Sequence, residues 1–169
     1  CIGKWHLGMD WPLKSGGIAR NEADAWNVDY TQPIQNGPLS VGFDEFYGIS
    51  ASLDMPPYLW IHNDRTVGIP TVEKTWIRKG PAHADFEAMD VLPEIGKKSI
   101  AYLTDRAKKP EPFFLYIPLA SPHTPILPTA AWQGKSGLNP YADFVMETDA
   151  VVGGILKSLD ELKLAENTL

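Results

Sequence analysis

The amino-acid sequence predicts an α/β fold built on a central, mostly parallel β-sheet. The main observation is that short apolar runs, typical of strands, alternate with longer segments of helical periodicity. A second observation is the order of these segments: a strand, a long excursion, a helix, a buried strand, a helix and the start of another strand. Strands that are separated by helices in this way pair in parallel, because a crossover returns the chain to the same end of the sheet.

The N-terminal half of the chain is expected to contain few regular elements. Residues 1–6 are predicted to end a strand, and residues 7–50, rich in Gly, Pro, Trp and Asn, to form a long loop region. Long loops in compact domains are often functional. Residues 58–69 are predicted to form a β-hairpin with its turn at Asn63, whereas residues 71–89 show no regular period.

The C-terminal half is expected to be more regular. A helix is predicted over residues 91–107, where Pro93 suits the first turn. Residues 113–117 form a continuous apolar run, which is typical of a strand covered on both faces. After a further helix, residues 167–169 are expected to begin another strand.

The last helix has the clearest pattern in the sequence. Asn139 is a good N-cap, and Pro140 fits the first helical position. Apolar residues then recur at three- and four-residue steps as far as Leu162. Gly153 and Gly154 lie inside this helix, where each glycine costs about 1 kcal/mol relative to alanine. We expect that cost to be offset by close packing of the helix on the sheet.

The composition is that of an ordinary globular protein and argues against several function classes. Hydrophobic residues make up 44% and charged residues 21% of the 169 residues, and the net charge is −6. Binding to nucleic acid would need a basic face, which this balance does not favour. No apolar run is long enough to span a membrane, and no P-loop, G-x-G-x-x-G or H-E-x-x-H motif is present. The one cysteine, Cys1, cannot form an internal disulfide.

Two histidine motifs mark a candidate site. GKWHLG occupies residues 3–8 and SPHTP occupies residues 121–125, and each follows a predicted strand. Because ligands of parallel sheets bind beyond the carboxyl ends of the strands, we expect Lys4, His6 and His123 at one rim of the sheet. Lys4 and His6 should also point the same way, since they lie two residues apart in an extended backbone. Their positive charge and N–H donors suit a tetrahedral oxyanion, such as a sulfate or phosphate ester.

A plain structural role is the alternative for each of these residues. A histidine that follows a strand is more often a loop or capping residue than a catalyst. Pro122 and Pro125 can simply shape a rigid turn around His123. His62 and His83 are expected to be surface or loop residues. The residues alone leave both interpretations open.

Four segments, taken in order, resemble the sulfatase family. GKWHLG at residues 3–8 resembles the second sulfatase motif, and GFDEFYG at residues 42–48 resembles the family's G-F-D-x-F-x-G. Residues 112–125 resemble its P-F-F-L-Y…P-H-x-P segment, and residues 141–169 resemble the helix and N-T-L that precede the family's last metal ligands. The resemblance covers nearly the whole chain. It implies an alkaline-phosphatase-like fold, with helices on both faces of a central, mostly parallel sheet.

The resemblance also implies a chemistry. Sulfatases hydrolyse sulfate esters with a divalent cation, usually calcium, and a formylglycine nucleophile made from the cysteine of a C-x-[PA]-S-R motif. Carried over by motif, Lys4 is implied to contact the sulfate and the formylglycine diol. His6 is implied to hydrogen-bond the diol and to help expel sulfate from the hemiacetal. His123 is implied to lie by the ester oxygen, where it binds sulfate or protonates the leaving alcohol.

Two further residues are weaker candidates for substrate binding. By their position after the G-F-D-x-F-x-G stretch, Ser52 is implied to reach the formylglycine region and Asp54 to line the substrate pocket. Both residue types are common in turns, and plain loop chemistry is the alternative.

The departures from the family pattern limit what this chain is expected to do. Cys1 is followed by Ile2, Gly3 and Lys4, so it is not a formylglycine site, and the aspartate pair and the Asp-Asn pair of the metal site are absent. We interpret residues 1–169 as an internal part of one sulfatase catalytic domain, inactive alone, which lacks the nucleophile segment and the metal-ligand segment. The expected substrate is a small sulfate ester or a sulfated carbohydrate. Family habit indicates a periplasmic or secreted protein.

Two other functions stay open. A phosphate or phosphonate ester hydrolase of the same superfamily would have a similar rim, because both ester classes present tetrahedral anions. A pseudo-sulfatase would keep the anion pocket, lack the nucleophile, and bind sulfated glycans without hydrolysing them. The nucleophile motif and the substrate preference distinguish these functions.

Overall fold

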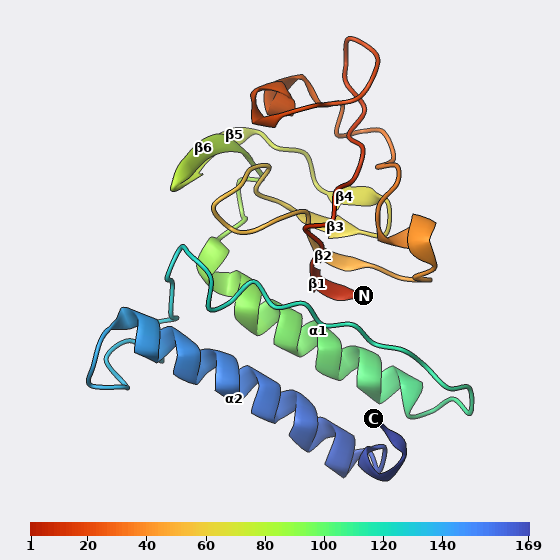
Figure 1. The fold of residues 1–169 in the computed structure, drawn as a ribbon, viewed down its shortest axis with the longest axis vertical. Helices are drawn as coiled ribbons and strands as arrows, with labels where there is room; N and C mark the ends of the chain where they lie inside the picture. The colour runs from red at the N-terminus through yellow and green to blue at the C-terminus, as the bar shows by residue number, and fades with distance from the viewer.

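The sheet of this protein is small and mixed. The computed structural model describes all residues, 1–169. Its four-stranded sheet has the order β1 (Ile2–Lys4), β2 (Tyr47–Ile49), β3 (Trp60–His62) and β4 (Arg65–Val67) (Figure 1). β1 pairs in parallel with β2, whereas β2 with β3 and β3 with β4 are antiparallel. The α/β class is as predicted, but within these residues the sheet is mixed rather than mostly parallel.

Two β-hairpins follow one another along the chain. The first, β3 with β4, confirms the prediction, and its turn contains Asn63 with a left-handed φ of 58°. The second pairs β5 (Val72–Trp76) with β6 (Arg78–Ala82), so the expectation of an irregular stretch over residues 71–89 is wrong there. Its turn contains Ile77 with a φ of 80°. This turn carries none of the Asn-Gly or Asp-Gly pairs that mark short hairpins in a sequence.

Two long helices lie side by side and run in the same direction (Figure 1). They are α1 (Val91–Arg106) and α2 (Pro140–Glu161), close to the predicted bounds. The side chain of Asn139 accepts a hydrogen bond from the backbone N–H of Ala142 at 2.9 Å, which confirms the predicted N-cap. Beyond α2, residues Ala165–Asn167 form a short 3₁₀ turn, and the expected start of a strand is not found. Neither helix has the length and apolar character needed to cross a membrane.

The close contact of α2 is with α1. A Cβ placed on Gly96 of α1 would lie 2.8 Å from Cγ1 of Val151 of α2, so glycine allows the two helices to approach here. Gly154 has only the Cδ1 of Ile100 at 4.0 Å, and nothing lies within 4 Å of a Cβ placed on Gly153. The expectation that this glycine pair lets α2 approach the sheet is therefore wrong.

The apolar run at residues 113–117 is extended but is not a strand of the sheet. The backbone N–H of Ile2 donates to the carbonyl of Tyr116 at 2.9 Å, and that of Lys4 donates to the carbonyl of Pro118 at 2.7 Å. The segment therefore lies parallel to β1, but Pro118 has no N–H with which to complete the ladder. Along residues 113–117 half-buried and exposed side chains alternate, so the expectation of a strand covered on both faces is wrong.

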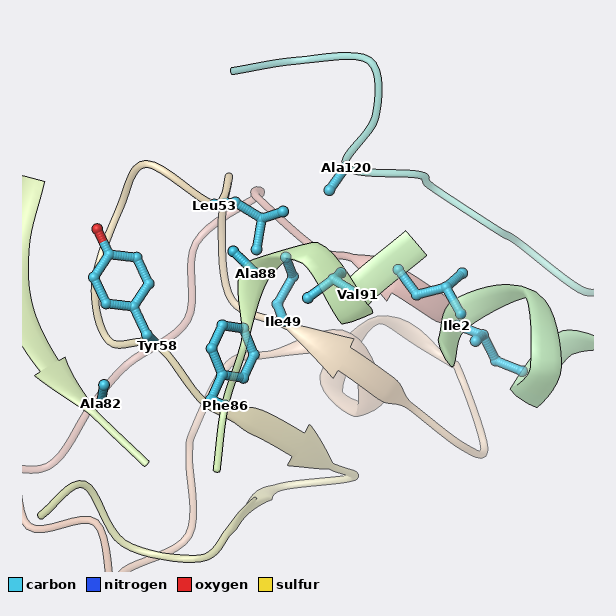
Figure 2. Packing of buried hydrophobic residues seen from close by; sticks show 10 residues of the cluster. Ile2, Ile49, Leu53, Tyr58, Ala82, Phe86, Ala88, Val91 and Ala120 are labelled. Atoms are coloured by element: carbon cyan, nitrogen blue, oxygen red, sulfur yellow. The ribbon is translucent and has the colours of Figure 1, made fainter. Parts of the chain in front are cut away.

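Apolar side chains cover both faces of the sheet. One cluster packs between the sheet and α1, where Figure 2 shows Ile2 of β1 beside Val91 of α1; its members are Ile2, Ile49, Leu53, Tyr58, Ala82, Phe86, Ala88, Val91, Ile95 and Ala120. Strand alternation sends the second cluster to the other face, beneath the long loop that joins β1 to β2; its members are Cys1, Trp5, Val28, Tyr30, Ile34, Phe46, Leu59 and Ile61. Within these residues one face is thus covered by α-helix and the other mainly by loop.

Candidate functional site

The first histidine motif lies where β1 leaves the sheet. β1 ends at Lys4, and the chain then stays hydrogen-bonded to the segment after β2, since the N–H of His6 donates to the carbonyl of Ser50 at 2.9 Å. Lys4 is half-buried and His6 is exposed, with buried Trp5 between them. His6 has a φ of 55°, so the backbone is no longer extended there. The simple alternation that was expected to point Lys4 and His6 the same way therefore does not extend to His6.

Trp5 anchors the turn that carries His6. Its ring is 6% exposed and packs edge-on against Phe43 at a centroid distance of 6.1 Å. Its indole N–H donates to the carbonyl of Gly8 at 2.7 Å. The buried side chain of Trp5 thus holds the loop after His6 in place through this hydrogen bond.

Ser52 lies against His6. Its hydroxyl oxygen is 3.2 Å from Nδ1 of His6, and the side chain is buried, with 2% of its surface exposed. The turn that holds Ser52 is closed by a hydrogen bond from the N–H of Met55 to the carbonyl of Ser52 at 2.9 Å. The structure therefore brings together two of the candidate residues: His6, which follows β1, and Ser52, which follows β2.

The second histidine motif follows the segment that runs beside β1. Because Tyr116 and Pro118 lie parallel to β1, this segment and β1 leave the sheet at the same end. His123 follows shortly after and is exposed. Its Nδ1 lies 2.7 Å from the carbonyl oxygen of Thr124. A carbonyl only accepts hydrogen bonds, so Nδ1 of His123 carries a proton and Nε2 is left to exchange one.

A glycine allows the two motifs to approach each other. Gly3 has a φ of 145°, and a Cβ placed on it would lie 2.2 Å from the carbonyl oxygen of Pro118. No side chain fits at this separation, which explains on steric grounds why the first position of the GKWHLG motif is a glycine. It sets the spacing between the strand that carries Lys4 and the segment that leads to His123.

Asp54 belongs to a different group of charges. Its Oδ2 lies 3.7 Å from Nη2 of Arg78 on β6, and Arg78 also pairs with Glu22. The other carboxylate oxygen, Oδ1, is buried and has no hydrogen-bond partner in the chain. Ser52 and Asp54 thus share one turn but contact different neighbours. Arg78 was not a sequence candidate, because its strand was not predicted. The β-branched and aromatic residues of β5, Val72, Thr75 and Trp76, were the available signal in the sequence.

The charges at the rim favour an anion. None of the ion pairs of the chain involves Lys4 or His6, so the ammonium of Lys4 is not neutralised by a carboxylate. No group of three His, Cys, Asp or Glu side chains lies close enough together to hold a metal ion. The residues of this chain therefore do not form a metal centre by themselves, and the rim is a set of cationic and N–H groups.

Comparisons with known proteins identify relatives of the chain. The chain is 27% identical to an N-acetylgalactosamine-6-O-sulfatase of Bacteroides thetaiotaomicron over 99% of its length and 38% of the relative. It is 30% identical to the human N-acetylgalactosamine-6-sulfatase over 92% of its length and 30% of the relative.

Solved structures of sulfatases share the fold of this chain. A sulfatase from work on glycosaminoglycan metabolism by Bacteroides thetaiotaomicron superposes with a TM-score of 0.78 at 26% identity, covering 99% of this chain and 40% of the other. The PsFucS1 sulfatase from a Pseudoalteromonas species superposes with a TM-score of 0.65 at 18% identity, covering 99% of this chain and 33% of the other. The chain therefore has the alkaline-phosphatase-like fold of these structures.

The chain spans less than half the length of the curated relatives it matches, 38% and 30% for the two named above. Over its own length the match is complete. The family model described as Sulfatase covers residues 1–169, and the chain belongs to the sulfatase family.

Proposed function

We propose that the protein hydrolyses sulfate esters, with Lys4, His6 and His123 as residues of its active site. The observation that carries this proposal is the shared rim: β1 and the segment at Tyr116 leave the sheet at the same end, next to the histidine motifs. The unpaired ammonium of Lys4 and the exposed rings of His6 and His123 supply the positive charge and N–H donors that suit a tetrahedral anion. Membership of the sulfatase family supports sulfate as that anion.

Each of the three residues has a distinct part in this proposal. Lys4 supplies a compact positive charge and up to three N–H donors for the sulfate oxygens. His6 hydrogen-bonds the oxygens of the sulfate or of the nucleophile. The Nδ1 proton of His123 is held by the Thr124 carbonyl, so Nε2 is the atom that would first take up a proton and, with both ring nitrogens then protonated, deliver it to the leaving alcohol.

The proposed substrate is a sulfated carbohydrate. The two relatives described above are enzymes for 6-sulfated N-acetylgalactosamine, and they match this chain over 99% and 92% of its length. We propose a 6-sulfated amino sugar of this kind as the first substrate to test. Asp54, with one buried carboxylate oxygen that has no partner in the chain, is proposed to lie at the substrate pocket.

The nucleophile and the metal belong elsewhere in the protein in this proposal. Cys1 does not lie in a C-x-[PA]-S-R motif, and the side chains of this chain form no metal centre. We propose a formylglycine nucleophile and a divalent cation, calcium, held by residues outside 1–169; neither enters the roles assigned above. Residues 1–169 alone are accordingly expected to be inactive, and a periplasmic or secreted location is proposed for the protein.

The test uses the full-length protein, coexpressed with a formylglycine-generating enzyme. Release of sulfate from N-acetylgalactosamine-6-sulfate is compared with hydrolysis of 4-nitrophenyl sulfate, 4-nitrophenyl phosphate and a phosphonate monoester. The proposal expects sulfate release, and its loss in the variants Lys4→Ala and His123→Ala.

Other outcomes would replace the proposal. Faster turnover of the phosphate or phosphonate ester than of any sulfate ester would reassign the protein to those hydrolases. Binding of a sulfated glycan without turnover, by protein in which mass spectrometry shows the formylglycine, would indicate a non-catalytic binding protein.

A further inference from the structure

The side-chain hydroxyl of Ser52 has a single hydrogen-bonding partner in the chain, and that partner is a histidine of the proposed site. Its hydroxyl oxygen lies 3.2 Å from Nδ1 of His6, and no other hydrogen bond of the chain involves this oxygen. The side chain is 2% exposed, so bulk water has almost no access to it. A buried hydroxyl without an acceptor for its proton is unfavourable, so the direction of this one hydrogen bond matters.

This hydrogen bond can run in either direction, and the two directions differ in whether the hydroxyl proton of Ser52 has an acceptor. If Nδ1 of His6 carries the proton, it donates to Ser52, and the buried hydroxyl proton of Ser52 is left without an acceptor. If Nδ1 is unprotonated, Ser52 donates to it, and both groups are satisfied. The second arrangement places the proton of the neutral imidazole on Nε2.

We propose that Ser52 is a positioning residue: its buried hydroxyl donates to Nδ1 of His6 and holds the neutral ring with its proton on Nε2. The exposed ring of His6 then presents a hydrogen-bond donor to an oxyanion. The backbone restrains the same residue, because the N–H of His6 is held by the carbonyl of Ser50 at 2.9 Å. Both anchors come from the chain that follows β2, so this loop sets the place and the tautomer of His6.

This arrangement is the opposite of that at His123. There Nδ1 carries the proton, because the carbonyl of Thr124 at 2.7 Å can only accept. The two neutral histidines thus present different atoms: a donor at Nε2 of His6 and an acceptor at Nε2 of His123. The donor suits binding of an anion, whereas the acceptor can take up a proton, which the ring could then pass to an ester oxygen. The meaning for catalysis rests on the proposed function, whereas the tautomer itself does not.

The test is histidine NMR on the full-length protein labelled with ¹⁵N-histidine, recorded over a range of pH so that the spectrum of the neutral ring is obtained. The His6 signals are identified by their loss in His6→Asn. Long-range ¹H–¹⁵N spectra distinguish the two neutral tautomers. The proposal expects Nε2–H for His6 in the unaltered protein, a mixture in Ser52→Ala, and recovery of Nε2–H in Ser52→Thr. Ser40→Ala, which removes a hydroxyl in the 3₁₀ segment Pro38–Val41, serves as the matched control and leaves the tautomer unchanged.

Activity gives a second readout. Loss of a group that orients a working histidine typically lowers activity about 10- to 100-fold, as for the partners of metal-binding histidines. We expect a fall of that size in kcat for Ser52→Ala, with KM nearly unchanged. An Nδ1–H tautomer for His6 in the unaltered protein, or an unchanged tautomer in Ser52→Ala, would overturn the inference. A protein with the expected tautomer but no sulfatase activity would instead reject the proposed function and leave the inference intact.

Discussion

Gly48 of β2 faces Gly3 of β1 so closely that a Cβ placed on Gly48 would lie 1.8 Å from the carbonyl oxygen of Gly3. The two glycines are register partners in the one parallel pair of the sheet. Just beyond them the same two strands lead to Lys4 and to Ser52. The separation of the candidate residues thus depends on the absence of a side chain at two backbone positions.

Gly48→Ala is expected to destabilise the protein strongly. The added methyl group would overlap the backbone of β1, and overpacking of a tight site costs about 1–3 kcal/mol or more. The measurement is urea unfolding of the full-length variant followed by tryptophan fluorescence.

Gly153→Ala is the matched control for that substitution. Nothing lies within 4 Å of a Cβ at this helical position, and alanine is favoured over glycine in a helix interior by about 1 kcal/mol. We expect this variant to be unchanged or slightly more stable. Equal destabilisation by both substitutions would contradict the steric account of Gly48.

Lys4→Ala is expected to lower kcat for sulfate hydrolysis by about 10²–10³-fold, the usual effect of removing one group that stabilises an oxyanion. Lys4→Arg should recover only part of this loss, because a planar guanidinium does not replace a compact ammonium. Lys97→Ala, on an exposed side of α1, is the control and should leave activity unchanged. Full activity of Lys4→Ala would remove Lys4 from the site.

His123→Ala is expected to lower hydrolysis of alkyl sulfates more than that of 4-nitrophenyl sulfate. An alkoxide leaves poorly without a proton, whereas nitrophenolate leaves readily, so a residue that protonates the leaving oxygen matters most for the first substrate. The typical contribution of such a group is about 10²–10⁴-fold. The comparison of both substrates in both proteins is the measurement.

His62→Ala is the control for His123. His62 lies on β3, its side chain is 57% exposed, and it is 4.0 Å from Glu45. It should retain activity on both substrates. An equal loss on both substrates in His123→Ala would assign His123 to sulfate binding and not to proton transfer.

Asp143 should make stability depend on acid pH. Hydrogen bonds from Ser136 and Gly134 lower the pKa of this carboxyl below its ordinary value of 3.8. Since the folded state has the lower pKa, this stabilisation is present above 3.8 and is lost as the pH falls through the folded-state pKa. The urea midpoint should therefore fall more steeply below about pH 4 in the unaltered protein than in Asp143→Asn.

Asp149→Asn is the control for that pH profile. Asp149 lies on an exposed part of α2, and its side chain makes no hydrogen bond within the chain. Its replacement should leave the acid limb of the stability curve unchanged. A similar flattening of the curve in both variants would show that general charge, and not the hydrogen bonds to Asp143, causes the effect.

The elements that sequence predicted well are those with strong local patterns. α2 has an N-cap, a first-turn proline and a long apolar period, and the β3–β4 hairpin has an asparagine at its turn. The β5–β6 hairpin was missed because Ile77, a β-branched residue, occupies the left-handed turn position. The apolar run at residues 113–117 predicts a strand covered on both faces. In the structure its pairing with β1 is incomplete, because Pro118 has no N–H to donate, and the apolar pattern of the run carries no sign of this.

The candidate site shows the same limit. Sequence motifs could indicate Lys4, His6 and His123, because both motifs lie at the carboxyl end of a predicted strand. The partners of the histidines could not be predicted, because they are a serine distant in sequence and the main-chain carbonyl of Thr124. A carbonyl has no sequence pattern of its own, and the contact of Ser52 with His6 depends on the register of β1 against β2.

The main-chain connection between β1 and the segment before His123 consists of the two hydrogen bonds accepted by Tyr116 and Pro118. A sulfate held by Lys4 and His123 together would act as a non-covalent cross-link between parts of the chain that are far apart in sequence. Anions that reach both residues should therefore raise the melting temperature of the protein as their concentration rises, because a ligand that binds only the folded state stabilises it by mass action. In Lys4→Ala, which can no longer hold the anion from β1, the same anions should raise the melting temperature less.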